Sequence, residues 1–346
     1  LKAKASEYSL SMIADSNHPL GREDLAGTFV RLVVVKPEED EKTAKAAGRT
    51  EQHDLNAKRE PIALKDLFAD PKNKRVIAQG RAGVGKSTTM RYICRRWALG
   101  EDAPKRDKHG DELWNPDFDA VVLIELTLNR HALVNSKSWT EFLGTILPLG
   151  LDVDAFWRWA HPSSRVLWIL DGVDEVQSLT NTTILGKMLH DKDFFGAGRL
   201  LIGTRPEAKG GIVNNLCVEI EGFTNVDVVY YVMQYFDIRA PFRDDFNGVR
   251  LAHLSQTERD KLRSLSGILP KDIVEKIAED VIPKAQEPTE RTKAGMQILK
   301  FIESSKEVRD MMKTPMSAEL VCFAGHELLK DSSFGMTNLY GQVVEK

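Results

Sequence analysis

The stretch of sequence that decides the fold runs Gly80-Arg81-Ala82-Gly83-Val84-Gly85-Lys86-Ser87. This order matches the phosphate-binding loop of nucleotide-binding α/β proteins. Glycines let the backbone adopt positive φ angles and approach a phosphate closely, and the N–H groups of the turn form an anion site at the start of the next helix. The ammonium of Lys86 would bind the β- and γ-phosphates, and the hydroxyl of Ser87 would bind Mg²⁺. We therefore expect a nucleotide site rather than a plain glycine-rich turn.

The segments on either side of the loop have the pattern that such a site needs. Residues 75–79 have three apolar residues at their centre and predict a short buried strand. Residues 88–99 predict a helix, because apolar side chains recur at helical spacing, at Met90, Ile93, Cys94 and Trp97. This order places the loop at the carboxyl end of a strand, where nucleotides bind in α/β sheets.

The composition is that of an ordinary globular protein. Its 346 residues are 42% hydrophobic and 29% charged, and the net charge of −3 gives no overall attraction to nucleic acid. No apolar run approaches the roughly 18 residues of a membrane span, and the N-terminus does not resemble a secretory signal. The three cysteines lie far apart, which favours a reducing cytosol over a disulfide framework or a zinc site. We expect a cytoplasmic protein and, because the sequence lacks an initiator methionine, a fragment of a longer chain.

A second motif follows about 85 residues after Lys86. The apolar run 166–170 ends in Asp171, and Asp174 and Glu175 come shortly afterwards. A carboxylate at the end of a buried strand can hold Mg²⁺ at the mouth of a parallel sheet. Asp174 and Glu175 are candidates to orient or deprotonate the attacking water.

A third motif ends in an arginine. Residues 199–204 predict another buried strand, and Arg205 follows it directly. Strand ends of a parallel sheet converge on the ligand, and a guanidinium there can bind a γ-phosphate through two hydrogen bonds. The alternative is a surface arginine at a strand exit; we favour the nucleotide role.

The remaining segments predict an α/β core. The run 120–126 is apolar except for its glutamate at 125, as in a parallel strand covered on both faces, and 29–35 is a β-branched run typical of a strand. Residues 139–147 and 153–160 predict helices. We therefore expect the three-layer core of a P-loop NTPase, with a parallel sheet between helices.

Three stretches admit a ligand-binding interpretation beside a structural one. The acidic run 38–41 is either a cation site or part of a solvated loop at 36–60, and the basic run 104–109 is either a nucleic-acid patch or a surface loop. Trp157 and Trp159 would either stack on bases or pack against the sheet. The structural interpretation is favoured in each case, so the sequence gives no direct evidence for a nucleic-acid partner.

The three motifs together resemble the NACHT branch of the STAND signalling ATPases. They read GRAGVGKS, LDGVDE and GTRP, and Glu221-Gly222-Phe223 and an aspartate at 227 follow. A small residue after the second motif's first aspartate, here Gly172, is characteristic of that branch, whereas most related ATPases have an acid there. The resemblance covers roughly residues 60–346.

The resemblance implies a role for each matched position. Residues 80–87 would be Walker A, with Thr88 close to the α-phosphate, and Asp171 would position Mg²⁺ together with Ser87. Asp174 would be the general base, assisted by Glu175. Arg205 would be the sensor arginine that detects the γ-phosphate, on a strand between the Walker A and Walker B strands.

The C-terminal part predicts helices. Residues 226–236 have an apolar stripe at Val229, Val232, Met233 and Phe236, and further helical segments occupy 258–265, 271–281 and 291–303. Pro315 either belongs to the family's proline motif, near the adenine, or simply starts the helix 316–329. Residues 336–345 resemble the first helix of the family's winged-helix domain. The predicted organisation is an N-terminal extension (1–59), a nucleotide-binding domain (60–220), a helical domain (221–325) and the start of a winged helix (326–346).

The resemblance implies an ATP/ADP-dependent molecular switch with Mg²⁺ as cofactor. Nucleotide exchange would control self-association in immune or cell-death signalling, hydrolysis would be slow, and the activating ligand is unknown. Two other classes remain open: an AAA+-type remodeller, which would need a second arginine for a neighbour's nucleotide, and a module that binds nucleotide without turnover. A small-molecule kinase fits less well, because no arginine-rich lid is evident.

Overall fold

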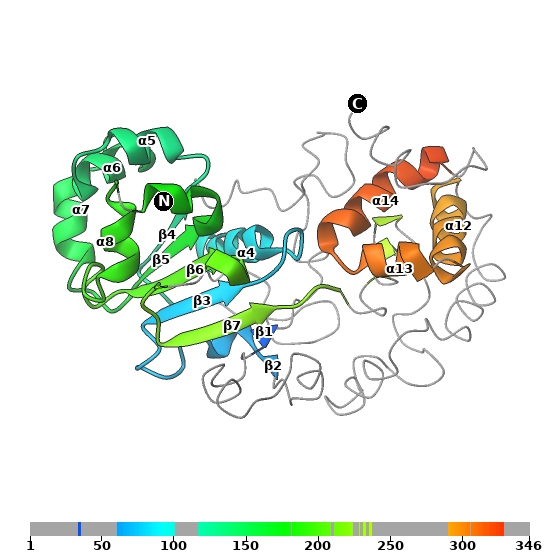
Figure 1. Ribbon diagram of the computed structural model, residues 1–346, viewed down its shortest axis with the longest axis horizontal. Coiled ribbons are helices and arrows are strands. Elements are labelled where there is room, and N and C mark those ends of the chain that lie inside the picture. Colours follow the sequence, from blue (N-terminus) through cyan, green and yellow to red (C-terminus); the bar gives the residue numbers. More distant parts are fainter. Residues whose placement is uncertain are drawn as a thin grey trace.

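The computed structural model describes residues 61–100, 117–180, 182–208, 211–223, 290–304 and 306–328, together with 34–35, 228, 231–232 and 235–236. An α/β core carries the three motifs, and a group of C-terminal helices lies beside it (Figure 1). The predicted segments at 36–60, 104–109, 258–265, 271–281 and 336–345 fall outside the described residues.

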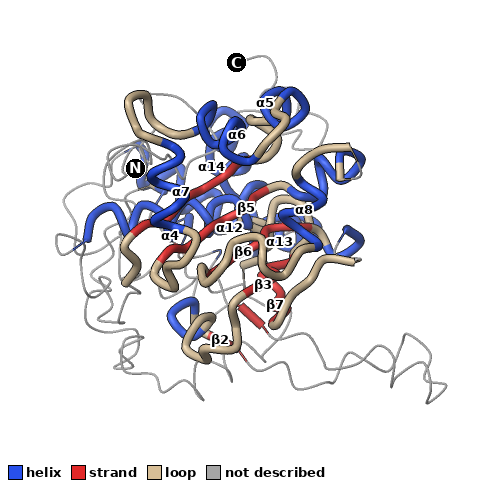
Figure 2. Tube along the Cα trace, turned by 90° about the vertical axis from the view of Figure 1, so that its left-hand side faces the viewer, coloured by secondary structure: helices blue, strands red, loops and turns tan. Residues whose placement is uncertain are grey.

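The core is built on one sheet of seven strands in the order β2-β1-β7-β3-β6-β5-β4. The strands are β1 (Val34–Val35), β2 (Pro61–Ile62), β3 (Arg75–Gln79), β4 (Ala120–Glu125), β5 (Val166–Asp171), β6 (Arg199–Thr204) and β7 (Leu216–Ile220). The five strands from β7 to β4 run parallel, whereas β1 pairs antiparallel with both β7 and β2. The predicted parallel α/β core is confirmed, and β6 lies between β3 and β5 as the resemblance implied. Figure 2 shows β7, β3, β6 and β5 in succession across the molecule.

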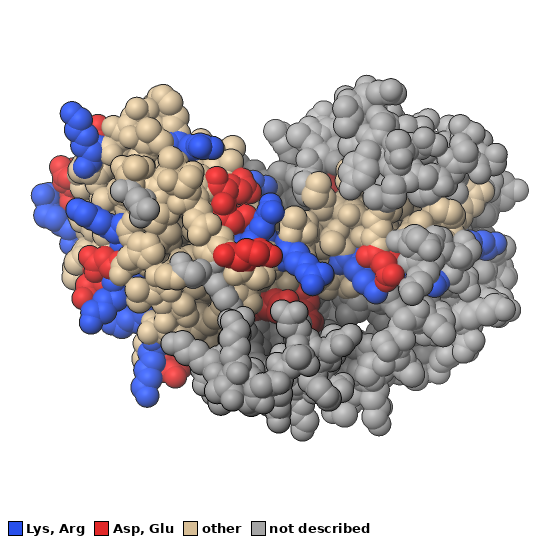
Figure 3. Space-filling view, in the orientation of Figure 1, with Lys and Arg blue, Asp and Glu red and all other residues tan. Residues whose placement is uncertain are grey.

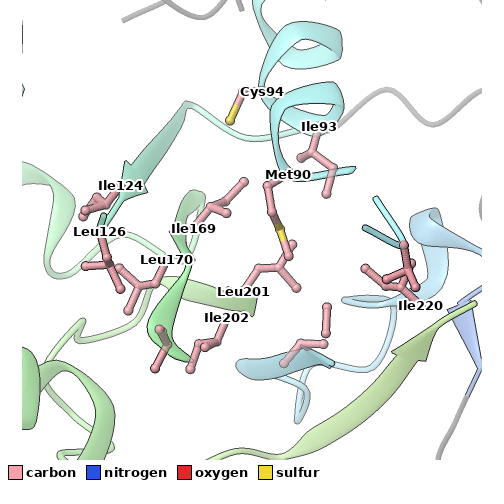
Figure 4. Packing of buried hydrophobic residues seen from close by; sticks show 14 of the residues in the cluster. Met90, Ile93, Cys94, Ile124, Leu126, Ile169, Leu170, Leu201, Ile202 and Ile220 are labelled. Carbon is pink, nitrogen blue, oxygen red and sulfur yellow. The ribbon is translucent and has the colours of Figure 1, made fainter. Parts of the chain in front are cut away.

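One face of the sheet is covered by helix α4 (Lys86–Leu99). Side chains alternate between the faces of a strand, so Ile169 and Asp171 of β5 share the face toward α4. Figure 4 shows Met90 pointing from α4 toward Ile169 and Leu201, and all three side chains are fully or almost fully buried. β5 is buried along its whole length, as expected for a central parallel strand covered on both sides.

Helices α6 (Trp139–Ile146), α7 (Val153–Ala160) and α8 (Leu185–His190) lie against the opposite face, with α5 (Arg130–Asn135) beside α6. The fully buried ring of Trp168 on β5 meets Trp139 of α6 at 5.6 Å and Trp157 of α7 at 5.7 Å between ring centroids. Trp157 therefore packs against the sheet as favoured, and it is not presented for base stacking. Trp159 remains 46% exposed.

The beginnings of α6 and α7 follow from their capping residues. Ser138 Oγ accepts a hydrogen bond from the N–H of Glu141 at 3.2 Å, and Asp152 Oδ1 accepts one from the N–H of Ala155 at 2.9 Å. Side-chain oxygens at this position satisfy the N–H groups that a helix leaves unpaired in its first turn. The two predicted helices start where they were expected for this reason.

Three helices at the C-terminal end pack together: α12 (Glu290–Ser304), α13 (Lys306–Met312) and α14 (Pro315–Leu328). They confirm the helices predicted at 291–303 and 316–329, although the predicted boundary at residue 325 falls inside α14. Of the predicted stripe at 226–236, Val232 and Phe236 are buried. The two other positions of that stripe, Val229 and Met233, lie outside the described residues.

Candidate nucleotide-binding site

The loop between β3 and α4 has the geometry that its glycines predict. Gly83 and Gly85 adopt φ angles of 75° and 97°, a region that side chains with a Cβ rarely occupy. A Cβ on Gly80 would lie 2.7 Å from Cγ2 of Val84 and 3.1 Å from the carbonyl oxygen of Ile220. Glycine is therefore required at these positions by the backbone and by the close packing of the loop.

The ammonium of Lys86 lies across this loop. Its Nζ donates to the carbonyl oxygens of Gly80 at 2.8 Å and Arg81 at 3.0 Å. Burial lowers the pKa of Lys86, and the nearby carboxylates of Asp174 and Asp171 act in the opposite direction. The predicted phosphate-binding charge is thus held at the loop, beside the carboxylates of the second motif. Thr88 is half-buried in the first turn of α4, while Arg81 and Ala82 are exposed.

Ser87 and Asp171, the two predicted Mg²⁺ ligands, contact each other. The hydroxyl of Ser87 donates a hydrogen bond to the Asp171 carboxylate, which is only 7% exposed. Burial raises the pKa of Asp171, the bond from Ser87 lowers it, and the nearby charge of Glu125 raises it again. A hydroxyl and a buried carboxylate are hard oxygen donors, so these residues fit Mg²⁺.

Two glycines make room for this carboxylate and for the turn that follows it. A Cβ on Gly203 of β6 would lie 2.8 Å from Asp171 Oδ1. Gly172 has a φ of 78°, and a Cβ there would lie 3.1 Å from Thr127 Oγ1. The small residue after Asp171, noted above as a family feature, is explained by this left-handed turn.

The candidate base and the candidate sensor form an ion pair. Arg205 Nε lies 2.9 Å from Asp174 Oδ2, and the side chains are 49% and 10% exposed. Both residues follow the carboxyl ends of their strands, Asp174 in the 3-10 helix η4 (Val173–Leu179) and Arg205 just before η5 (Pro206–Ala208). Glu175 Oε2 accepts a hydrogen bond from Thr127 Oγ1 at 2.6 Å. The site residues predicted from the three motifs thus converge on one edge of the sheet.

Sequence reasoning missed a second ion pair at this edge. Arg91 of α4 donates to Glu125 Oε1 of β4 through Nε at 2.9 Å and Nη2 at 2.5 Å. Glu125 pairs in register with Asp171. The available signals were a carboxylate at the end of an apolar strand, as at Asp171, and an arginine four residues after Ser87.

Pro315 is the first residue of α14, and its neighbours contact the phosphate-binding loop. The N–H of Met316 donates to the carbonyl oxygen of Gly83 at 3.4 Å, and a Cβ on Gly83 would lie 3.6 Å from the Cβ of Thr314. Thr314 Oγ1 also accepts from the N–H of Ser317 at 3.3 Å, as a helix cap does. Pro315 therefore starts the helix, as the structural interpretation has it, and stands at the edge of the loop; its contact with an adenine stays a prediction.

The junction between core and C-terminal helices is charged on the face drawn in Figure 3, where acidic and basic side chains lie next to one another. Over the described part of the chain, no group of three or more His, Cys, Asp or Glu side chains is arranged to hold a metal ion. A cation bound by Ser87 and Asp171 would therefore need further oxygen atoms from a nucleotide and from water. Within the same residues, no helix is both long and apolar enough to cross a bilayer.

Comparison with known proteins gives one group of relatives. No family model matches the chain. The "NACHT, LRR and PYD domains-containing protein 3" of cattle, mouse and human is 27% identical to it over 267, 263 and 266 residues, or 68% of this chain. The human "NACHT, LRR and PYD domains-containing protein 12" is 25% identical over 279 residues. The chain spans about a quarter (24%) of the length of these relatives.

A search of solved structures found "Structure of Drosophila ORC bound to DNA", with a TM-score of 0.37 and 11% identity over 82% of this chain and 64% of that one. A likeness at this level carries no inference about function. The sequence similarity and the P-loop core agree with the motifs: over about two thirds of its length, this chain is similar to proteins with a NACHT-type NTPase domain.

Proposed function

We propose that this chain is the nucleotide-binding part of an ATP/ADP-dependent molecular switch. One observation carries the proposal beyond nucleotide binding: the residues that start α14 lie on the phosphate-binding loop, through the bond from Met316 to Gly83. The loop would contact the nucleotide on one side, and it contacts α14 on the other. A change in the nucleotide would therefore alter how the loop holds the C-terminal helices. Such coupling between a ligand and a packed element is the basis of a two-state switch.

The proposed site assigns each charged group a role. Lys86 and the loop N–H groups would hold the β-phosphate, while Ser87 and Asp171 would hold Mg²⁺. When bound, Mg²⁺ would neutralise charge on the β- and γ-phosphates. Arg205 would bind the γ-phosphate, so it would distinguish ATP from ADP.

We expect hydrolysis to be slow, because the proposed general base is held in an ion pair that a γ-phosphate must first break. Asp174 can accept a proton from water only with a free carboxylate oxygen that faces the attacking molecule. In the arrangement described here, Oδ2 is bound to Arg205 at 2.9 Å. A γ-phosphate would compete with Asp174 for that guanidinium, which links nucleotide sensing to the release of the base. Glu175, which accepts a hydrogen bond from Thr127, would assist Asp174 in orienting the attacking water.

The wider role is proposed from the relatives. The ADP-bound form would keep the core and the C-terminal helices closed, and exchange for ATP would favour an open form that self-associates. We place this activity in innate immune or cell-death signalling in the cytoplasm, under control of an activating ligand that the sequence does not identify.

The first experiment is to denature the purified protein and identify any released nucleotide by chromatography. About one ADP per chain is expected, because a closed switch traps its product. An empty site with rapid ATP turnover would instead favour an ATP-driven remodeller. An empty site without turnover would contradict trapping by this chain alone.

A further inference from the structure

The ion pair between Arg91 and Glu125 has no role in the site as proposed so far, although it adjoins the predicted Mg²⁺ ligands. In parallel strands, residues that pair in register point to the same face. Glu125 and Asp171 are such a pair, and the N–H of Leu126 donates to the carbonyl oxygen of Asp171 at 3.0 Å. The two carboxylates therefore stand side by side on the face that α4 covers.

Arg91 reaches Glu125 from the same helix that carries Ser87. Residues four apart lie on one side of an α-helix, so the Ser87 hydroxyl and the Arg91 guanidinium face the same strand ends. Ser87 contacts Asp171, and Arg91 contacts Glu125. Two matched contacts thus join the first turns of α4 to the ends of β5 and β4.

The geometry leaves one oxygen of Glu125 available. Both N–H groups of Arg91 go to Oε1, at 2.9 Å and 2.5 Å, and no described residue donates a hydrogen bond to Oε2. The Glu125 side chain is 16% exposed, so water reaches it at the mouth of the sheet. Mg²⁺ usually keeps several of its waters in a nucleotide site, and carboxylates that bind such waters orient the metal from outside its ligand shell.

We propose that Glu125 is a positioning residue that accepts a hydrogen bond from a water on the Mg²⁺ held by Ser87 and Asp171, and that Arg91 fixes Glu125 for this purpose. The inference rests on the nucleotide-binding function proposed above. Arg91 occupies Oε1 and balances the charge of Glu125, so Oε2 is the oxygen that would accept from the metal-bound water. The alternative is that the pair only ties α4 to β4.

The test is a Mg²⁺ titration of the binding of a fluorescent, non-hydrolysable ATP analogue, together with binding in EDTA. Glu125→Gln keeps the shape of the side chain and one acceptor for Arg91, but its second position becomes an amide donor. We expect the Mg²⁺ concentration at half-maximal enhancement of binding to rise about 10- to 100-fold, the usual effect of losing such a partner. Affinity in EDTA should stay within a factor of about two, because the proposed role is lost without the metal.

Two further variants complete the design. Glu125→Asp keeps the charge but shortens the side chain, so the Mg²⁺ requirement should again rise. If the Glu125→Gln protein folds poorly, Glu125→Asp still tests the inference. Asp154→Asn removes an exposed negative charge on α7, a helix on the face of the sheet opposite to α4, and should leave the titration unchanged.

Each remaining outcome overturns a specific claim. If Glu125→Gln and Glu125→Asp have the Mg²⁺ requirement of the wild type, or lose affinity equally in EDTA and in Mg²⁺, the pair is only structural and the inference fails while the proposed function stands. If the wild-type chain binds no analogue under any condition, the proposed function fails and the inference fails with it.

Discussion

Gly203 shows how a single missing side chain shapes the surroundings of Asp171, the proposed Mg²⁺ ligand. A Cβ at position 203 would lie 2.8 Å from Oδ1 of Asp171 and 3.2 Å from Cε of Met90. The Asp171 carboxylate can lie this close to β6 only because residue 203 has no side chain. Both neighbours are the ends of side chains, so they can shift without moving the backbone. A substitution here would therefore act on the site more than on the fold.

We predict that Gly203→Ala lowers Mg²⁺-dependent nucleotide binding about tenfold or more, because the new methyl group would displace Asp171, the proposed Mg²⁺ ligand. The thermal midpoint should fall little, since flexible side chains absorb the clash. Isothermal titration with ATP in Mg²⁺ and in EDTA measures the first quantity, and calorimetric melting the second. Loss of stability without a change in the Mg²⁺ dependence would contradict this account.

Lys86 and Asp174 test whether binding and hydrolysis can be separated. Lys86→Ala should abolish nucleotide binding, because it removes the charge held over the loop by Gly80 and Arg81. Asp174→Ala should preserve binding and lose hydrolysis, since it removes only the proposed base. Equilibrium binding and single-turnover phosphate release distinguish the two variants. Equal loss of binding in both would refute this division of roles.

At the scale of secondary-structure elements, Arg75 joins strand β3 to helix α8. Its guanidinium donates to the carbonyl oxygens of Met188, Leu189, Asp191 and Val213 at 2.8 to 3.1 Å, and only 4% of the residue is exposed. The last carbonyl groups of a helix have no partner within it, so the arginine satisfies the C-terminus of α8. Burial lowers the pKa of Arg75 to about 10, which still leaves it charged at neutral pH.

We predict that Arg75→Met destabilises the fold by about 2–4 kcal/mol, because several buried carbonyl groups lose their donor. Arg199→Met is the matched control on β6: its side chain makes one bond, to the carbonyl oxygen of Pro71, and should cost about 0.5 kcal/mol. Urea denaturation followed by circular dichroism gives both values. Similar losses in the two variants would show that the α8 contacts contribute little.

At the scale of the whole molecule, the C-terminal helices contact the core through the short turn before α14 and the first residues of α14. The carbonyl oxygen of Lys313 accepts from the N–H of Phe223 at 2.6 Å, and Met316 binds Gly83. A Cβ on Gly222 would lie 2.2 Å from that Lys313 oxygen. This turn lies between the end of the β7 segment and the phosphate-binding loop, so it is the natural place to couple them.

Gly222→Ala should push the turn off the core, because the clash is with backbone that cannot rotate away. We expect bound ADP to dissociate about tenfold faster, which corresponds to a barrier to dissociation that is about 1.4 kcal/mol lower. Stopped-flow release of a fluorescent ADP measures this rate. Gly144→Ala on α6 is the control, since its Cβ would meet only Val153 at 3.9 Å. If the Gly222→Ala protein releases ADP at the wild-type rate, α14 is not coupled to the nucleotide site.

The sequence by itself determined the strand–loop–helix at the phosphate-binding loop, the buried strands that end at Asp171 and just before Arg205, and the helices α6, α7, α12 and α14. These follow from local patterns: glycines at left-handed positions, continuous apolar runs, and helical spacing of apolar residues. The tertiary structure alone decided which strand ends are neighbours. Glu125 lies beside Asp171, Arg205 beside Asp174 and Met316 beside Gly83 because packed faces, and not local sequence, set the order of strands and the docking of helices.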